Sequence, residues 1–200
     1  IIDTPGMNDT KDIRQDQENI RDILETLESV DKLSGIMIML PIVQHRVTPN
    51  FRRYMTDLLS SIHVDASENI LFGYPHANST QWRSSDVQIA LRSTLDQLKL
   101  KIATSPDAQN QFMFEAEPFR YLAACKQLER HLPGREKYDA MWNTSCDQIN
   151  KLIKRLEELP VHEVGKTLCL KRTRDLLSGM PKPLTRIVSI MKESQKSLEL

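Results

Sequence analysis

The chain has 200 residues, 40% of them hydrophobic and 27% charged, and its formal net charge is +0. These values are typical of one globular domain with or without an appended segment, and they provide no global attraction to nucleic acid or to an anionic membrane. The cysteines Cys125, Cys146 and Cys169 are odd in number and form no C-x-x-C pair, which disfavours a disulfide framework and predicts a reducing compartment, the cytoplasm.

Short apolar runs alternate with helical spacing over the first part of the chain. The dipeptide Ile1-Ile2 indicates the end of a buried strand, and three later runs indicate strands at 36–40, 69–74 and 111–115. Helical spacing occupies 12–30, 48–62, 85–102 and 118–128. Thr48 is the expected N-cap of the second helix and Pro49 its first residue, and Ser85 or Asp86 is the expected cap of the third. This alternation predicts an α/β fold with a mostly parallel sheet.

No strand pattern follows Glu136, and amphipathic helices are predicted at 136–160, 167–177 and 183–198. The change of pattern falls near Leu132-Pro133-Gly134. We therefore expect an α/β domain over residues 1–132 and a helical extension over residues 135–200.

The segment Asp3-Thr4-Pro5-Gly6 is the most informative for chemistry. An Asp at the carboxyl end of a strand can hold Mg²⁺ through a water, and the Gly three residues later lets its backbone N–H approach a terminal phosphate. Ligands of parallel sheets bind at this edge. The same four residues also form a common turn after a strand. The strand–helix order that follows favours the phosphate site over the turn.

A phosphate-binding loop of the form G-x-x-x-x-G-K-[ST] does not occur at any of the six glycines. The tripeptide Gly165-Lys166-Thr167 matches the end of this motif, but the position five residues earlier, where the motif has its first glycine, is Pro160. We therefore interpret the tripeptide as a turn between helices.

Several segments in this order resemble one family. Residues 1–6 with Asp9-Thr10, then residues 69–80, then residues 118–124, are similar to P-loop GTPases of the translation-factor class. The similarity is greatest to uncharacterised G domain-containing proteins related to immunity-associated (avirulence-induced) and septin-like GTPases. The resemblance implies an incomplete P-loop NTPase three-layer sandwich followed by an all-α extension. It also implies an N-terminally truncated fragment that lacks the Walker A loop.

The resemblance implies nucleotide-binding roles for four residues. Asp3 would hold Mg²⁺ through a water, Gly6 would contact phosphate, and His76 and Asn78 would lie in the nucleobase loop of a GTP-binding protein. The alternative for His76 is an ordinary solvent-facing loop histidine. Pro75-His76-Ala77-Asn78 lacks the aspartate with which such GTPases bind guanine, and Met7 stands in place of a catalytic Gln. No catalytic residue is therefore predicted, and this chain alone should bind nucleotide weakly.

A second function remains open: a degenerate, non-hydrolysing scaffold whose C-terminal helices mediate self-association or bind a protein partner. Glu115 and Glu117 could contact base or ribose, although capping of the next helix is favoured for them. The cations Lys166, Lys171, Arg172 and Arg174 are expected to form a solvated helix surface. The sequence contains no H-x-x-x-H pair, so no zinc site is predicted.

Overall fold

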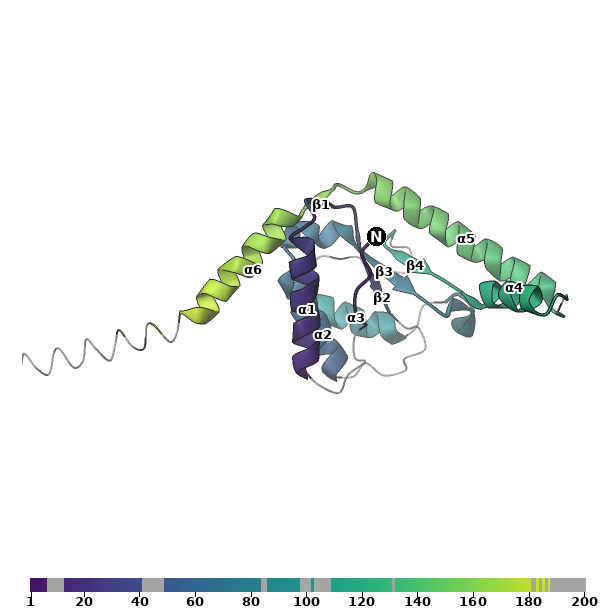
Figure 1. Ribbon diagram of the computed structural model, residues 1–200, viewed down its shortest axis with the longest axis horizontal. Helices are drawn as coiled ribbons and strands as arrows, with labels where there is room; N and C mark the ends of the chain where they lie inside the picture. The colour runs from purple at the N-terminus through teal and green to yellow at the C-terminus, as the bar shows by residue number, and fades with distance from the viewer. Residues whose placement is uncertain are drawn as a thin grey trace, which may run out of the picture.

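The computed structural model describes residues 1–6, 13–40, 49–83, 86–97, 102, 109–130, 132–180, 183, 185 and 187. Within these ranges the protein is mixed α/β, with a parallel three-stranded sheet and a separate two-stranded sheet. Figure 1 shows the central sheet between helices, with α1 and α6 together on one side and α5 on the other. Among the described residues, no helix combines the length and the hydropathy needed to cross a membrane.

The central sheet contains the three predicted apolar strands. They are β2 (Ile36–Met39), β3 (Ile70–Tyr74) and β4 (Gln111–Met113), in the order β2-β3-β4. Both pairings are parallel, with Ile36 opposite Ile70 and Tyr74 opposite Met113. All five residues of β3 are buried because this strand is central and covered on both faces.

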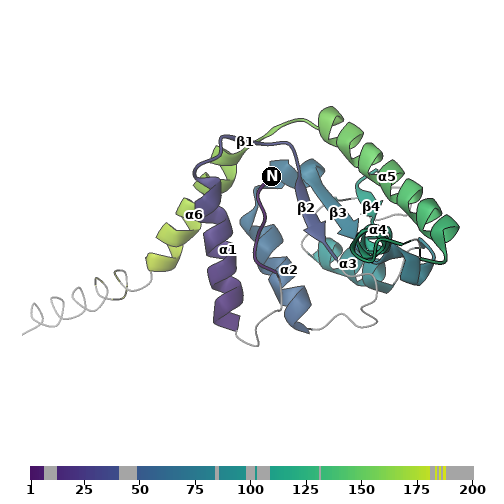
Figure 2. The same cartoon turned by 45° about the vertical axis from the view of Figure 1, so that its right-hand side comes forward.

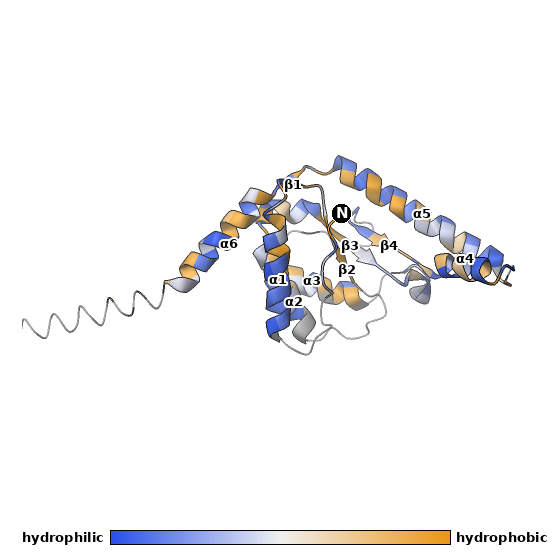
Figure 3. Cartoon of the chain, in the orientation of Figure 1, coloured by the Kyte–Doolittle hydropathy of each residue, from blue (hydrophilic) through white to orange (hydrophobic). Residues whose placement is uncertain are grey.

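Helices cover both faces of this sheet (Figure 2). The helices α2 (Pro49–Ser61) and α3 (Asp86–Gln97) pack on the side of Phe72, and α5 (Arg135–Glu158) packs on the side of Leu71. Alternate residues of a strand point to opposite faces, which explains why neighbours in β3 belong to different cores. Figure 3 shows polar and apolar residues alternating along α1, α5 and α6, as expected of amphipathic helices.

The remaining elements pack around this layer. In α1 (Ile13–Leu27), the buried Ile20 and Leu24 contact Tyr54 of α2. The short helix η1 (Val64–Asn69) leads into β3, and η2 (Ala77–Thr80) follows it. After β4, the chain continues into α4 (Glu117–Gln127) and then into α5.

The C-terminal part is not wholly helical, contrary to the prediction. The strand β5 (His162–Glu163) pairs antiparallel with β1 (Lys32–Leu33). Each strand has two residues, which is too short to generate a period-two pattern in the sequence. The helix α6 (Val164–Gly179) then begins directly after β5.

The buried Asn69 joins this small sheet to the central one. Its Nδ2 atom donates to the carbonyl oxygens of Ser34 at 2.9 Å and of Pro160 at 2.6 Å. Only 1% of Asn69 is exposed. One side chain therefore ties the turn before β2 and the end of α5 to the start of β3.

Two local predictions are wrong. Residues 1–6 form no strand and are all exposed, and Figures 1 and 2 draw them as coil beside β2. A strand needs a hydrogen-bonded neighbour, and none of the described residues pairs with Ile1 or Ile2. Gly165-Lys166-Thr167 lies in the first turn of α6 rather than in a turn between helices, because the helix begins at Val164.

The helix predictions are largely confirmed, with shifted ends. Pro49 is the first residue of α2, and Asp86 is the first residue of α3. Thr48 and Ser85 lie outside the described residues, as does most of the helix predicted at 183–198. The coarser part of the fold prediction, a mixed α/β arrangement with a parallel sheet, is confirmed, and the incomplete P-loop sandwich stays a prediction.

Candidate functional site

The loop after β3 carries two of the predicted site residues. His76 adopts a left-handed conformation, with φ 61° and ψ 37°, and its side chain is exposed. The next residue, Ala77, is fully buried, and its backbone N–H donates to the Phe114 carbonyl at 3.1 Å. The reversal at His76 thus lets the loop leave the sheet while Ala77 anchors it to the segment that follows β4.

The hydroxyl and backbone groups of the loop stabilise its turn. The Ser79 hydroxyl donates to the His76 carbonyl at 2.7 Å, and the backbone N–H of Trp82 donates to the Ala77 carbonyl at 2.9 Å. Just before the loop, burial raises the pKa of the Tyr74 phenol to about 12, so this group stays neutral at physiological pH. The two hydrogen bonds therefore close the turn over residues 76–82.

Glu115 determines how this loop meets the next one. Its carboxylate accepts from the backbone N–H of Asn78 at 3.0 Å and from that of Glu117 at 3.1 Å. The residue is 8% exposed. The second bond satisfies a free N–H in the first turn of α4, so the helix-capping prediction is confirmed for Glu115. Glu117 is exposed and its carboxylate pairs with Arg120 at 3.4 Å.

Helix α5 closes the outer edge of β4 at its carboxyl end. The backbone N–H of Met113 donates to Oε1 of Gln148 at 3.3 Å, and that of Glu115 donates to the Ser145 hydroxyl at 3.2 Å. The same hydroxyl donates back to the Glu115 carbonyl at 3.2 Å. These side chains satisfy backbone groups that an edge strand would otherwise leave unpaired.

Asp3 and Gly6 belong to residues 1–6, which are exposed and run as coil beside β2 (Figures 1 and 2). The Asp3 carboxylate accepts from the backbone N–H of Thr4 at 3.1 Å through Oδ1. Within the described part of the chain, no hydrogen bond or ion pair connects Asp3 or Gly6 to His76 or Asn78. The structure therefore places His76 and Asn78 in one loop, with Asn78 bonded to Glu115, and it leaves Asp3 and Gly6 in a separate exposed segment.

The described residues around Asp3 offer few ligands for the predicted Mg²⁺. Mg²⁺ is commonly held by one or two carboxylates, substrate phosphates and several waters. Asp3 can supply one carboxylate oxygen, Oδ2, and the described residues contain no group of three or more His, Cys, Asp or Glu side chains able to hold a metal. Asp3 therefore offers one exposed carboxylate, and any further ligands of a metal ion would have to come from phosphate and water.

Two residues of the tripeptide Gly165-Lys166-Thr167 take part in a polar network at the start of α6. The buried Thr167 hydroxyl lies 2.9 Å from Nε2 of His162 and accepts from the backbone N–H of His63 at 3.2 Å. Nearby, Lys166 Nζ donates to the Asp65 carboxylate at 2.8 Å. The Lys and Thr of this motif therefore fasten α6 to η1 and are not arranged around a phosphate.

The same network changes the pKa of three groups. Burial lowers the pKa of His162, and the neighbouring His63 and Lys166 lower it further. The hydrogen bond between Lys166 and Asp65 lowers the pKa of the Asp65 carboxyl and raises that of the Lys166 ammonium. The shifts of Asp65 and Lys166 favour the charged forms that make their contact, and the shift of His162 favours its neutral imidazole.

Sequence reasoning missed two structural roles here. Asn69 and Gln148 each make long-range bonds to backbone groups, over 91 residues for Asn69 to Pro160 and 35 for Gln148 to Met113. A polar residue directly before a buried apolar strand was the available signal for Asn69. Gln148 had none, since it occupies an ordinary position in a helical pattern.

Comparison with known proteins adds no relative. No protein-family model matches the chain, and no curated protein matches it.

Proposed function

We propose that this chain forms the base-binding and magnesium-binding part of a cytoplasmic GTP-binding protein, a switch or an assembly protein with the P-loop sandwich fold. The observation that carries the proposal is the loop His76-Ala77-Asn78 at the carboxyl end of a central parallel strand. Ligands of parallel α/β sheets bind outside this edge. Glu115 fixes the loop through the Asn78 N–H, so the exposed groups are preorganised. The three free cysteines support a reducing compartment.

Each predicted residue has a defined task in this proposal. His76 is exposed and can stack on or hydrogen-bond to the base, and the Asn78 side chain can hydrogen-bond to it. Asp3 would hold Mg²⁺ through a water, and the Gly6 N–H would contact the terminal phosphate. Mg²⁺ supplies charge neutralisation of the phosphates when bound, and the chain supplies orientation. Hydrolysis in the full-length protein requires a phosphate-binding loop.

Calorimetry with GTP and Mg²⁺ tests the proposal on the 200-residue chain and on the full-length gene product. We expect weak or no binding by the chain and Mg²⁺-dependent binding by the full-length protein. In the latter, Asp3→Ala should abolish Mg²⁺-dependent hydrolysis and His76→Ala should weaken GTP binding. The control Asp147→Ala removes an exposed carboxylate on α5. Unchanged turnover in Asp3→Ala, or tight binding by the short chain, would refute the proposal.

An exposed stripe on α5 favours the second candidate, a scaffold that self-associates through its C-terminal helices. Trp142, Ile149 and Ile153 are 42%, 44% and 50% exposed, and the half-buried Cys146 lies between them in the sequence. Their spacing of four, three and four residues is that of a coiled-coil seam. The spacing is the same from either end, so two antiparallel copies would pair Trp142 with Ile153.

The oligomeric state tests this second candidate. We expect the chain to form a dimer in sedimentation equilibrium, and Ile149→Asp to convert it to a monomer. A matched control is Asn143→Asp, which adds the same charge on the same helix outside the stripe. A monomer at all concentrations, or a dimer that persists in Ile149→Asp, would exclude self-association through α5.

A further inference from the structure

We infer that the groove between α5 and the segment after η2 binds the polyphosphate group of a small anionic molecule. This site is separate from the carboxyl edge of the sheet, because neither His76 nor Asn78 lines it, and it does not depend on the function proposed above. The groove has a volume of about 840 Å³. That volume is typical of sites for small organic ligands.

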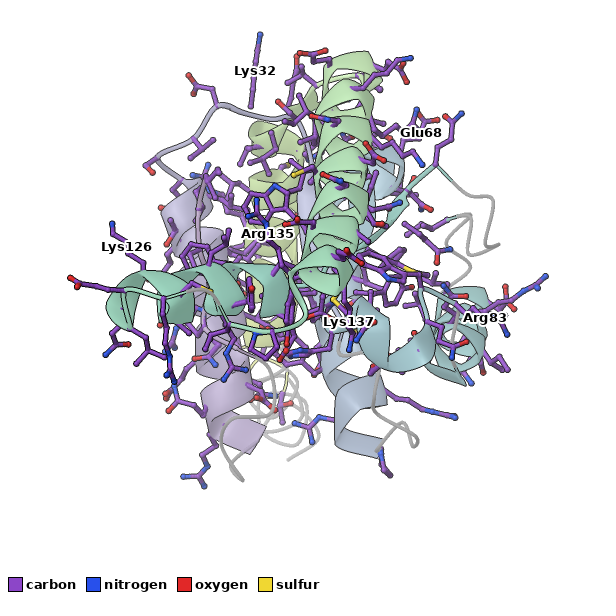
Figure 4. All side chains as sticks on the ribbon, turned by 90° about the vertical axis from the view of Figure 1, so that its right-hand side faces the viewer. Lys32, Glu68, Arg83, Lys126, Arg135 and Lys137 are labelled. Atoms are coloured by element: carbon purple, nitrogen blue, oxygen red, sulfur yellow. The ribbon has the colours of Figure 1, made fainter. Side chains whose placement is uncertain are left out.

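Four cationic side chains line the groove. Lys151, Lys154 and Arg155 come from successive turns of α5, and Arg83 comes from the segment after η2. A single carboxylate, that of Glu158, accompanies them. Figure 4 looks onto α5 and shows Arg83 to one side of the helix and Lys137 near the helix start; Lys137 is not among the lining residues. The groove therefore has a local excess of positive charge in a chain whose formal net charge is +0.

These cations are largely free to bind an anion. Among the ion pairs between described residues, none includes Arg83, Lys151 or Lys154, and the contact of Arg155 with Glu158 is long, at 4.0 Å. The Nε atom of Arg155 is buried and has no hydrogen-bond partner. An unpaired buried guanidinium N–H is costly unless an acceptor reaches it, and a phosphate oxygen is a suitable acceptor.

The rest of the lining suits the uncharged part of such a molecule. Trp82, Phe112 and Met113 supply apolar area, and the amides of Gln109 and Gln148 lie among them. Trp82 has φ 60°, so its backbone is held in a left-handed conformation that brings the residue out of the η2 turn. A mixture of apolar walls and a few polar groups is typical of ligand sites.

An added peptide strand is a poorer occupant than a compact anion. The groove follows the outer edge of β4, but the Met113 N–H on that edge is already bonded to Gln148 at 3.3 Å. A strand joining β4 would have to displace this bond. A polyphosphate uses the side chains of both walls and leaves the edge intact.

Tryptophan fluorescence tests the inference directly. The chain has two tryptophans, so Trp142→Phe leaves Trp82 in the groove as the only reporter. The probe is inorganic tripolyphosphate, titrated at constant ionic strength and checked by calorimetry. We expect saturable binding of one tripolyphosphate per chain. The double variant Lys151→Gln/Lys154→Gln should bind it at least about tenfold more weakly, because it loses two charge-assisted contacts to phosphate. The variant Lys151→Arg/Lys154→Arg should keep the wild-type affinity within about threefold.

A matched control separates the groove from general charge. Lys126→Gln/Lys137→Gln removes two exposed cations outside the groove and should change the affinity by less than about twofold, because distant surface charges are screened by salt. Asp3→Ala and His76→Ala should also leave tripolyphosphate binding unchanged, which distinguishes this site from the proposed nucleotide edge. Equal losses in the groove pair and the control pair, a signal that does not saturate, or equally tight binding of a hexaglutamate peptide would overturn the inference.

Discussion

The carboxylate of Glu115 accepts a hydrogen bond from the backbone N–H of Asn78 at 3.0 Å, and this bond joins the loops that follow β3 and β4. Its other oxygen accepts from Glu117 in the first turn of α4. Because the side chain is buried, neither bond can be replaced freely by water.

Glu115→Gln should lower the free energy of unfolding by about 1–3 kcal/mol, because an amide has one oxygen to offer to two N–H donors. Urea denaturation followed by circular dichroism measures the change. Glu117→Gln is the matched control: its side chain is exposed, so its loss should stay within about 0.5 kcal/mol. Equal stabilities of the two variants would contradict a structural role for the Glu115 carboxylate.

Asn69→Asp should destabilise the fold more strongly, by about 3–5 kcal/mol. The change removes both N–H donors and sets a carboxylate against the carbonyl oxygens of Ser34 and Pro160. Thermal and urea unfolding report the loss. Asn143→Asp makes the same chemical change at an exposed position of α5 and should have little effect. A wild-type unfolding midpoint for Asn69→Asp would show that these two bonds contribute nothing.

His162 should make stability dependent on pH. Its pKa is lowered in the folded state by burial and by His63 and Lys166, whereas an unfolded histidine has a pKa of about 6.5. The unfolded chain therefore binds the proton more readily, and the free energy of unfolding should fall as the pH drops from about 7.5 to about 5.5.

Urea unfolding across this pH range measures the effect of His162. In His162→Gln the curve should be flatter between these pH values, while His76→Gln, at an exposed loop position, should keep the wild-type slope. Parallel curves for the wild type and His162→Gln would rule out His162 as the titrating group.

Neighbouring positions in α3 should respond very differently to truncation. Leu91 is 0% exposed and packs in the core beneath β3, whereas Ile89 is 71% exposed. Leu91→Ala should cost about 2–5 kcal/mol of unfolding free energy, because the core cannot fully close the cavity. Ile89→Ala should change it by no more than about 0.5 kcal/mol. Chemical denaturation of both variants checks the difference, and a similar cost at both positions would contradict the packing of α3.

The central strands could be predicted because their residues are continuously apolar. Ile70 to Phe72 must be buried on both faces, and only a covered strand or a buried helix does this at such a length. Pro49 marked the start of α2 because its missing N–H is tolerated at the first helical position. The Glu115 cap was predicted from the preference of acidic side chains for helix N-termini.

Other features were not predictable because they depend on distant partners. The pairing of Lys32 with Glu163 has no local pattern, since a two-residue strand is specified only by what lies beside it. The polyphosphate groove combines Arg83 with α5 residues more than sixty positions away, and only the packing of α5 on the sheet makes them neighbours. Ile1-Ile2 misled the prediction because β-branched residues favour strands only where a partner strand exists.

The contact between Asn69 and Pro160 spans 91 residues, and that between His63 and Thr167 spans 104. A ribosome delivers the chain from its amino end, so β3 and η1 leave the exit tunnel long before their partners are made. Until residues 160 and 167 have emerged, the Asn69 side-chain amide and the His63 backbone N–H lack these partners and remain open to other acceptors. Folding that waits for such late contacts is slow, and the nascent chain meanwhile exposes the apolar strand β3. The bonds that unite the two sheets and fix the start of α6 can therefore form only near the end of synthesis.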